Sequence, residues 1–218
     1  DPTIVGSLRS TFRAPMGRFA NRLAGNGIRH GTGNEDEDRW LRFFQKGGDG
    51  EVDVNIIQMF SKGEIFQIAL ALNVPKSILQ ARPSPDLWGD NEVSGGQTDE
   101  MEIKKYLGIS DFPQSVYSYI DLETGKYKNI GLIEEMNRFL DIIPIDAPWW
   151  SNSNSMMANN MKIAEFFPSL TEDQLQRFIS SVKHAEFVTR HKENPNIPTL
   201  GCRNDMIAKG MLTNNLSI

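Results

Sequence analysis

Gly31-Thr-Gly-Asn-Glu-Asp-Glu37 and Phe43-Phe44-x-Lys46-x-Gly48-Asp49-Gly50-x-x-Asp53 are the two stretches that decide how this sequence is interpreted. The first is a glycine turn that leads into a run of acidic residues, and the second is a glycine-rich loop with a lysine and two carboxylates. Glycine lets the backbone come close to a ligand, lysine provides a point charge for a phosphate, and carboxylate oxygens suit Mg²⁺. The two stretches together are typical of loops that bind a nucleotide and its metal.

Each part of these stretches also has a simpler interpretation. Residues 31–34 are compatible with a plain turn, and residues 35–38 with the start of a helix, where negative charge is favoured. Phe43 and Phe44 are core residues or a stacking platform. Lys62 lies at the start of a later helix, where it is either a ligand for an anion or a solvated surface lysine. The residues alone leave these alternatives open.

Residues 6–24 have the pattern of an amphipathic helix, whose apolar residues recur at spacings of four, three and four. We expect this stripe to pack against a core, with a solvated face of interleaved arginines. Pro15 lies inside the pattern, so a kink or an early end of the helix is expected there. The stripe consists of Phe12, Met16, Phe19 and Leu23.

Two capping boxes predict the starts of further helices. Ser61 with Glu64 has this spacing, as does Thr171 with Gln174. A short helix is expected at 75–80, and short strands are expected at 28–30 and 52–57. The second capping box precedes a predicted buried stripe of Leu175, Phe178, Ile179 and Val182.

The composition is that of one ordinary globular chain. Its 218 residues are 39% hydrophobic and 23% charged, and the net charge of -5 argues against a nucleic-acid partner. Cys202 is the only cysteine, which favours a reducing compartment such as the cytoplasm. No apolar run approaches the roughly 20 residues that cross a bilayer, so no membrane association is expected. Because the chain does not start with methionine, we expect a fragment, a processed product or one half of a split protein.

Further motifs follow in a fixed order: Pro83-Ser84-Pro85-Asp86-Leu87, then Gly96-Gln97-Thr98-Asp99-Glu100, then His191-Lys192. With the first two stretches, this order resembles the ammonia-dependent NAD synthetases, which are ATP pyrophosphatases that activate a carboxylate as an acyl adenylate. The resemblance covers residues 6–110 well and is looser beyond them.

The resemblance implies roles for eight residues. It implies contacts with ATP, with Mg²⁺ as the metal, and with deamido-NAD, the dinucleotide that ammonia converts to NAD. Positions that match the contacts with deamido-NAD are Lys46, Asp53, His191 and Lys192. Positions that match the contacts with ATP are Thr32, Lys62 and Ser84, and Glu37 matches the Mg²⁺ ligand. Asp49 matches an acidic residue of the family to which no role is given.

The chain also departs from the family pattern. One extra residue lies between Glu37 and Phe43, and Thr11 replaces an arginine that contacts the dinucleotide. The phosphate loop of the family, Ser-Gly-Gly-x-Asp-Ser, is absent from the sequence, and the similar Ser94–Asp99 lies in the wrong place. Because the backbone N–H groups of such a loop hold the pyrophosphate, we expect this chain alone to be inactive.

The expected fold class is α/β, an incomplete Rossmann-like adenine-nucleotide α-hydrolase sheet with a helical C-terminal part. Residues 1–110 are expected to form the C-terminal half of the nucleotide-binding domain, 111–193 a helical extension, and 194–218 an irregular tail. The resemblance also implies a homodimer, or a partner segment that supplies the phosphate loop.

Two functions follow from these expectations. The chain is an NAD synthetase or its substrate- and metal-binding fragment, or it is a non-catalytic homologue that binds a nucleotide or acts as an assembly subunit. Trp149-Trp150, with Met156-Met157 nearby, fits either a partner surface or the protein's own core.

Overall fold

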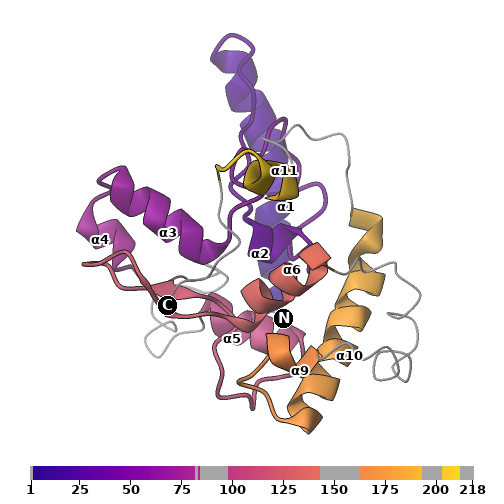
Figure 1. Cartoon of the computed structure of the whole chain (residues 1–218). Helices are drawn as coiled ribbons and strands as arrows, with labels where there is room; N and C mark the ends of the chain where they lie inside the picture. The colour runs from indigo at the N-terminus through magenta and orange to yellow at the C-terminus, as the bar shows by residue number, and fades with distance from the viewer. Residues whose placement is uncertain (1, 82, 84–97, 143–162, 193–202, 212–218) are drawn as a thin grey trace.

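The computed structural model describes residues 2–81, 83, 98–142, 163–192 and 203–211, and this part of the chain is mainly helical (Figure 1). None of the helices in these ranges is both long and apolar enough to cross a membrane. In chain order the elements are α1 (Pro2–Leu23), α2 (Glu35–Asp38), α3 (Lys62–Ala71), α4 (Lys76–Leu79), α5 (Asp99–Tyr106), β1 (Tyr119–Ile120), β2 (Tyr127–Asn129), α6 (Leu132–Ile142), α9 (Ile163–Phe166), α10 (Glu172–Thr189), the 3-10 helix η1 (Arg190–Lys192) and α11 (Arg203–Ala208).

The described strands form one small antiparallel sheet, in which β1 pairs with β2. A separate parallel bridge joins His30 to Val54, and the backbone N–H of Gly31 donates to the carbonyl oxygen of Val54 at 2.7 Å. The segments expected to be strands at 28–30 and 52–57 thus form only this bridge. The helical C-terminal part is confirmed by α6, α9 and α10, whereas the wider Rossmann-like sheet stays a prediction.

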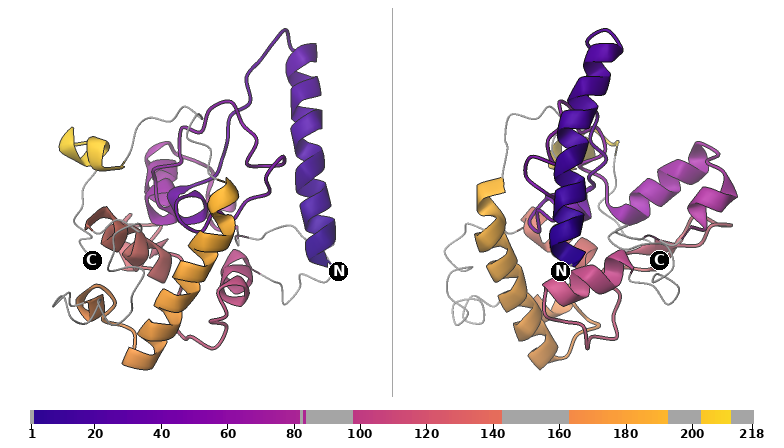
Figure 2. Two further views of the ribbon diagram at one scale, coloured as in Figure 1. Left: turned by 90° about the vertical axis from the view of Figure 1, so that its right-hand side faces the viewer. Right: turned by 180° about the vertical axis from the view of Figure 1, so that it is seen from behind.

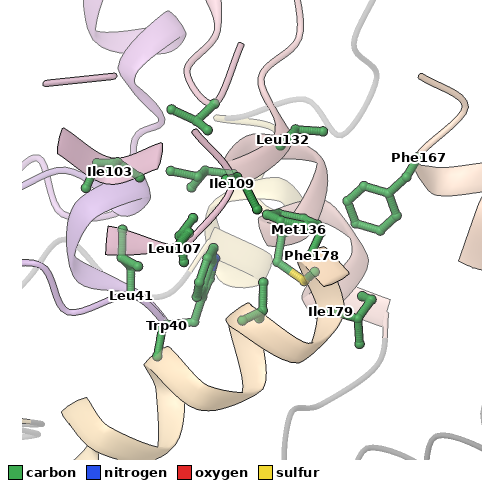
Figure 3. Close-up of a cluster of buried hydrophobic side chains, with 14 of the residues drawn as sticks. Trp40, Leu41, Ile103, Leu107, Ile109, Leu132, Met136, Phe167, Phe178 and Ile179 are labelled. Carbon is green, nitrogen blue, oxygen red and sulfur yellow. The ribbon is translucent and has the colours of Figure 1, made fainter. Parts of the chain in front are cut away.

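The hydrophobic core lies between α5, α6, α9 and α10, and Trp40 and Leu41 enter it from the segment after α2 (Figure 3). Aromatic rings meet edge to face inside it: the rings of Phe167 and Phe178 lie 5.6 Å apart. The predicted stripe of α10 is confirmed, because Phe178 and Val182 are fully buried and Ile179 nearly so. Figure 1 shows α3 and α10 on opposite sides of the molecule.

The apolar stripe of α1 is not buried, and the expectation that it packs against a core is wrong for the described residues. Phe12, Met16, Phe19 and Leu23 have exposed fractions of 60%, 62%, 59% and 74%. The helix stands at the edge of the molecule in the left view of Figure 2, so no described element covers this face. Pro15 lies inside α1 without ending it.

Both capping boxes are confirmed. Ser61 accepts a hydrogen bond from the backbone N–H of Glu64, whose side chain accepts one from the backbone N–H of Ser61. Thr171 and Gln174 form the same reciprocal pair at the start of α10. These caps satisfy backbone donors that a helix start leaves free, and they fix where α3 and α10 begin.

A buried carboxylate joins three helices near the start of α3. Asp36 of α2 accepts hydrogen bonds from the backbone N–H of Lys62 and from the side-chain amide of Asn137 in α6, each at 2.9 Å. Asp36 is fully buried. Burial raises its pKa well above the usual range, and the nearby Glu134 carboxylate adds to this shift. The contacts of Asp36 hold the first turn of α3 beside α2.

Some sequence predictions fall outside the described ranges. Ser84, the Trp149-Trp150 pair and Met156-Met157 lie there. The expected irregular tail, 194–218, contains the short helix α11 in its described part, so that prediction is corrected.

Candidate functional site

The turn before α2 borders a cavity of about 270 Å³. Thr32, an exposed residue, and Glu37 line it from this side, and Lys192 lines it from η1, which directly follows α10. Three of the eight predicted site residues therefore share one cavity. Its other lining residues are Gly33, Asp38, Arg39, Arg42, Phe43, Phe44, Asp49, Gly50, Val52, Asn55 and Gln58.

The glycines of the turn make room for the protein's own side chains. A Cβ atom on Gly33 would lie 2.3 Å from Oδ2 of Asp38, and one on Gly31 would lie 2.9 Å from Cγ2 of Val52. Side chains of this chain fill the space in which a Cβ atom would lie, so these positions have no room for a larger residue, and ligand access to their backbone stays a prediction. The glycines let α2 and the segment at 52–55 close against the turn.

Asp38 is the carboxylate that this packing places under the cavity. Burial raises its pKa to about 7, and the neighbouring carboxylates of Glu37 and Asp49 contribute. The side-chain amide of Asn55 donates to Oδ2 of Asp38 at 3.0 Å. The cavity floor is thus a crowded set of acidic groups that gains from any cation brought near it.

Lys62 supplies such a cation from the first turn of α3. Its Nζ lies 3.3 Å from Oε1 of Glu37 and 2.9 Å from Oδ2 of Asp99, and 4.1 Å from the centre of the Tyr117 ring. Burial alone would lower the pKa of the ammonium, but the two carboxylates outweigh burial and raise it. Lys62 is therefore a cation held close to the predicted Mg²⁺ ligand.

The predicted dinucleotide contacts at opposite ends of the sequence meet in space. Nζ of Lys46 donates to the carbonyl oxygen of His191 at 2.8 Å. Nζ of Lys192 donates to the carbonyl oxygens of Phe44 at 2.6 Å and Arg42 at 3.1 Å. Burial lowers the pKa of Lys192, and the Asp49 carboxylate opposes this shift. The residues at 191–192 thus close over the loop that carries Lys46.

Arg42 shapes this loop. Its φ of 46° lies in the left-handed region, which residues other than glycine seldom adopt. Nη1 of the same residue lies 3.6 Å from Oε1 of Glu186 in α10. The turn is thereby held against α10, and it directs two carbonyl oxygens at Lys192.

The two phenylalanines of the loop have different surroundings. Phe43 packs against the hydrophobic core and meets Tyr106 edge to face at 5.2 Å. Phe44 lies near the cation of Lys192, whose Nζ is 5.4 Å from its ring centre. Both rings also line a second cavity of about 430 Å³, together with Arg9 and Arg13 of α1. The core interpretation therefore describes Phe43 well, and Phe44 faces the cavities.

Asp53 lies apart from this group. It accepts hydrogen bonds from the guanidinium of Arg18 at 2.6 and 2.7 Å and from the backbone N–H of Arg29 at 2.7 Å. The bond from Arg18 holds the pKa of Asp53 below its usual range, and the bond from Arg29 helps. The residue borders a third hollow that it shares with α1 and residues 26–28.

The metal assignment rests on Glu37. Within the described ranges, no group of three or more histidine, cysteine, aspartate or glutamate side chains could hold a metal ion. Mg²⁺ commonly binds through one or two carboxylates and takes its other ligands from phosphates and water. Glu37, which reaches both cavities, fits a Mg²⁺ ion whose other ligands are phosphate and water oxygens. It does not fit a metal site built from protein ligands alone.

Sequence reasoning missed several residues around the cavities. Asp99 and Tyr117 surround the Lys62 ammonium, and Asn55 and Arg42 shape the cavity wall. The Gly96–Glu100 motif singled out Asp99 without a role. Tyr117 lies in a segment with no motif, so no sequence signal pointed to it.

Comparisons with known proteins show which family this chain resembles. A family model described as NAD synthase matches residues 11–135, which extends beyond the 6–110 of the motif resemblance. An NH(3)-dependent NAD(+) synthetase of Thermoplasma volcanium is 37% identical over 133 residues, which are 60% of this chain and 51% of that protein. The protein of the same name from Alkaliphilus oremlandii is 39% identical over 138 residues, 61% of this chain and 47% of that protein.

The chain spans about half the length of the curated relatives it matches. A solved structure, that of NMN synthetase from Francisella tularensis, is similar in fold with a TM-score of 0.50 at 22% identity, covering 90% of this chain and 58% of that one. Since the family model covers more than half of its residues, the chain belongs to the NAD synthase family.

Proposed function

We propose that this chain is the substrate- and metal-binding portion of an ammonia-dependent NAD synthetase. In the full reaction the carboxylate of deamido-NAD attacks the α-phosphorus of ATP and pyrophosphate leaves. Ammonia then attacks the carbonyl carbon of the adenylate, AMP leaves, and NAD is formed. The proposed ligands are Lys46, Asp53, His191 and Lys192 for deamido-NAD, Thr32, Lys62 and Ser84 for ATP, and Glu37 for Mg²⁺.

One observation carries the proposal: the ammonium of Lys46 bonds to the backbone of His191 at 2.8 Å. These residues are 145 positions apart, and the family resemblance assigns both to the same ligand from their sequence motifs alone. A chance resemblance gives no reason for the two ends of the sequence to meet beside the cavity that Thr32 and Glu37 line.

The reaction requires the substrates to be positioned, and it requires no protein nucleophile. Ammonia is itself the nucleophile, so the protein gains rate by holding the two substrates in line. Mg²⁺, held through Glu37, would neutralise charge on the phosphates of ATP. Lys62, on the first turn of α3, and Lys192, above the loop, then face the anionic groups of the two substrates as cations.

We also propose the expected organisation for the complete nucleotide-binding domain. Residues 1–110 would be its C-terminal half, with the parallel bridge of His30 and Val54 as part of a larger Rossmann-like sheet. Residues 111–193 would be the helical extension. The exposed stripe of α1 supports a homodimer in which a second copy covers it, because aromatic residues and methionine are enriched in interface cores.

A binding experiment tests the site. Calorimetry of deamido-NAD with this chain should detect weak binding, and Lys46→Ala and Asp53→Ala should each reduce it. Lys126→Ala, at an exposed lysine in the turn before β2, is the control. If both site variants bind as the unchanged chain does, the proposed dinucleotide site is wrong.

An activity experiment tests the reaction. The chain alone should form no NAD above background from deamido-NAD, ATP, Mg²⁺ and ammonia, because its sequence lacks the Ser-Gly-Gly-x-Asp-Ser loop. Fusion to the loop-bearing segment of a relative should restore turnover. If the fusion binds ATP and deamido-NAD but forms no NAD, the alternative of a non-catalytic nucleotide-binding or assembly subunit is favoured.

A further inference from the structure

The Gly96–Glu100 motif has no role in the proposed function, yet three of its residues make well-defined contacts. Oγ1 of Thr98 accepts a hydrogen bond from the backbone N–H of Met101 and caps α5. Oε2 of Glu100 accepts a hydrogen bond of 2.6 Å from the hydroxyl of Tyr119. These two contacts act within the fold. Asp99, between them, is the one of the three that the structure bonds to a proposed ATP ligand.

The Lys62 ammonium is enclosed by groups from three separate segments. Glu37 comes from α2, Asp99 from α5, and Tyr117 from the segment before β1. The exposed fractions of the Lys62, Asp99 and Glu37 side chains are 13%, 21% and 26%. Such a partly buried pair is screened less by water and salt than a surface pair, so it can hold a flexible lysine in one place.

The ring of Tyr117 is itself fixed. Tyr117 is 2% exposed, and its backbone passes so close to Gly131 that a Cβ atom there would lie 2.3 Å from the carbonyl carbon of Tyr117. The backbone N–H of Val116, one residue earlier, donates to Glu100 at 3.3 Å. A rigid aromatic face therefore covers one side of the ammonium, where a cation is favoured, and Asp99 covers another.

Of the two carboxylate partners, Asp99 lies nearer to the ammonium, at 2.9 Å against 3.3 Å for Glu37. If Glu37 binds Mg²⁺, as proposed above, its oxygens are engaged by the metal, and Asp99 is left as the carboxylate that holds Lys62. We propose that Asp99 is a positioning residue that acts through Lys62. With the ring of Tyr117, it keeps the ammonium beside Glu37, which lines both cavities and near which the phosphates of ATP would be bound. This inference rests on the proposed ATP contact of Lys62.

A double-mutant cycle tests the inference on the chain as it exists. ATP and adenosine are titrated into the unchanged chain, Asp99→Asn, Lys62→Met and the double variant. Asp99→Asn should weaken ATP binding about three- to tenfold, leave adenosine binding unchanged, and add nothing in the Lys62→Met background. Glu123→Gln is the control, since it makes the same kind of carboxylate-to-amide change at an exposed residue that lines neither cavity, and it should change neither affinity.

The inference is overturned if Asp99→Asn weakens ATP binding equally with and without Lys62. It is also overturned if Asp99→Asn weakens adenosine binding by the same factor, or has no effect on ATP binding. Each of these results would mean that Asp99 serves the fold rather than the lysine.

A second measurement needs no nucleotide and separates this inference from the proposed function. The lysines are labelled with ¹³C-methyl groups, and the Lys62 signal is assigned by its loss in Lys62→Met. Asp99→Asn should shift that signal and increase its mobility, and Glu123→Gln should not. If the signal shifts but the chain binds no ATP, the ATP contact of Lys62 fails while its positioning by Asp99 stands. An unmoved signal overturns the positioning whatever ATP does.

Discussion

The ammonium of Lys192 donates a hydrogen bond of 2.6 Å to the carbonyl oxygen of Phe44, 148 positions earlier in the chain. A second bond, of 3.1 Å, reaches the carbonyl oxygen of Arg42. These bonds tie the end of the α10–η1 segment to the loop after α2. Both segments line the cavity.

Replacing Lys192 should loosen this tie. Lys192→Met keeps most of the aliphatic stem but leaves the carbonyl oxygens of Arg42 and Phe44 without their charged donor. Hydrogen bonds to charged groups contribute about 1.5–3 kcal/mol each, and part of this is recovered by water at a half-buried site. We expect a loss of about 1–3 kcal/mol in the free energy of unfolding, measured by urea titration. Lys105→Met, at an exposed position of α5, should change it by less than about 0.5 kcal/mol. Equal effects would mean that the tie does not stabilise the fold.

Glu135 should make stability depend on pH. Burial, with the neighbouring Glu134 carboxylate, raises its pKa to about 7, whereas an unfolded glutamate has a pKa of about 4.3. Between these values the native state keeps a proton that the unfolded chain has released, so stability falls as pH rises from about 4.3 to about 7. Glu135→Gln removes this loss. The variant should be more stable than the unchanged chain at pH 8, by roughly 1–3 kcal/mol, and the difference should shrink at pH 5.

Chemical unfolding at the two pH values measures the Glu135 effect. Glu123→Gln, at an exposed turn residue, is the control and should show the same pH dependence as the unchanged chain. A Glu135→Gln variant that gains no stability at pH 8 relative to pH 5 would contradict the shifted titration.

The Arg18–Asp53 pair should make stability fall as the pH is lowered, whereas Glu135 makes it fall as the pH rises. The pKa of Asp53 is lowered by its bond from Arg18, so its contribution is present above the unfolded value and is lost as pH falls through the lowered folded pKa. Asp53→Asn should therefore make acid unfolding begin at a higher pH, and Arg18→Met should have the same effect. Acid titration followed by far-ultraviolet circular dichroism measures it, and an unchanged acid transition in both variants would count against the pair.

Replacing a buried and an exposed phenylalanine by alanine should change the free energy of unfolding by very different amounts. Phe178 is fully buried, so Phe178→Ala should cost about 3–5 kcal/mol. Phe12 is 60% exposed, and Phe12→Ala should change monomer stability by less than about 0.5 kcal/mol.

If a second copy covers α1, Phe12→Ala should still weaken self-association. Sedimentation equilibrium measures the association. A Phe12→Ala chain that associates as tightly as the unchanged one would exclude this face from the interface.

The local elements were largely predictable from the sequence. The capping boxes at Ser61 and Thr171 identify helix starts because their hydrogen bonds span only three residues. The buried stripe of α10 follows from its spacing, since one face of a helix meets the core. The same rule failed for α1, because periodicity shows that a helix has an apolar face but not what covers that face.

The site was predictable only in part. The ordered motifs identified Thr32, Glu37, Lys46, Lys62 and the pair at 191–192, and the structure places these residues around neighbouring cavities or in contact with one another. Asp53 is separated from them by its pairing with Arg18, a contact between residues 35 positions apart that no motif contains.

The sequence by itself determined the family, the helix starts and the identities of the charged residues, because these depend on residue type and short spacing. Only the tertiary structure decided which charges meet. Lys62 is held by Asp99, 37 positions later, and Lys192 by the carbonyl oxygen of Phe44. The physical reason is that such contacts depend on how α5 and α10 pack on the common core. That packing is a sum of many weak apolar contacts, which the spacing of the charged residues does not encode.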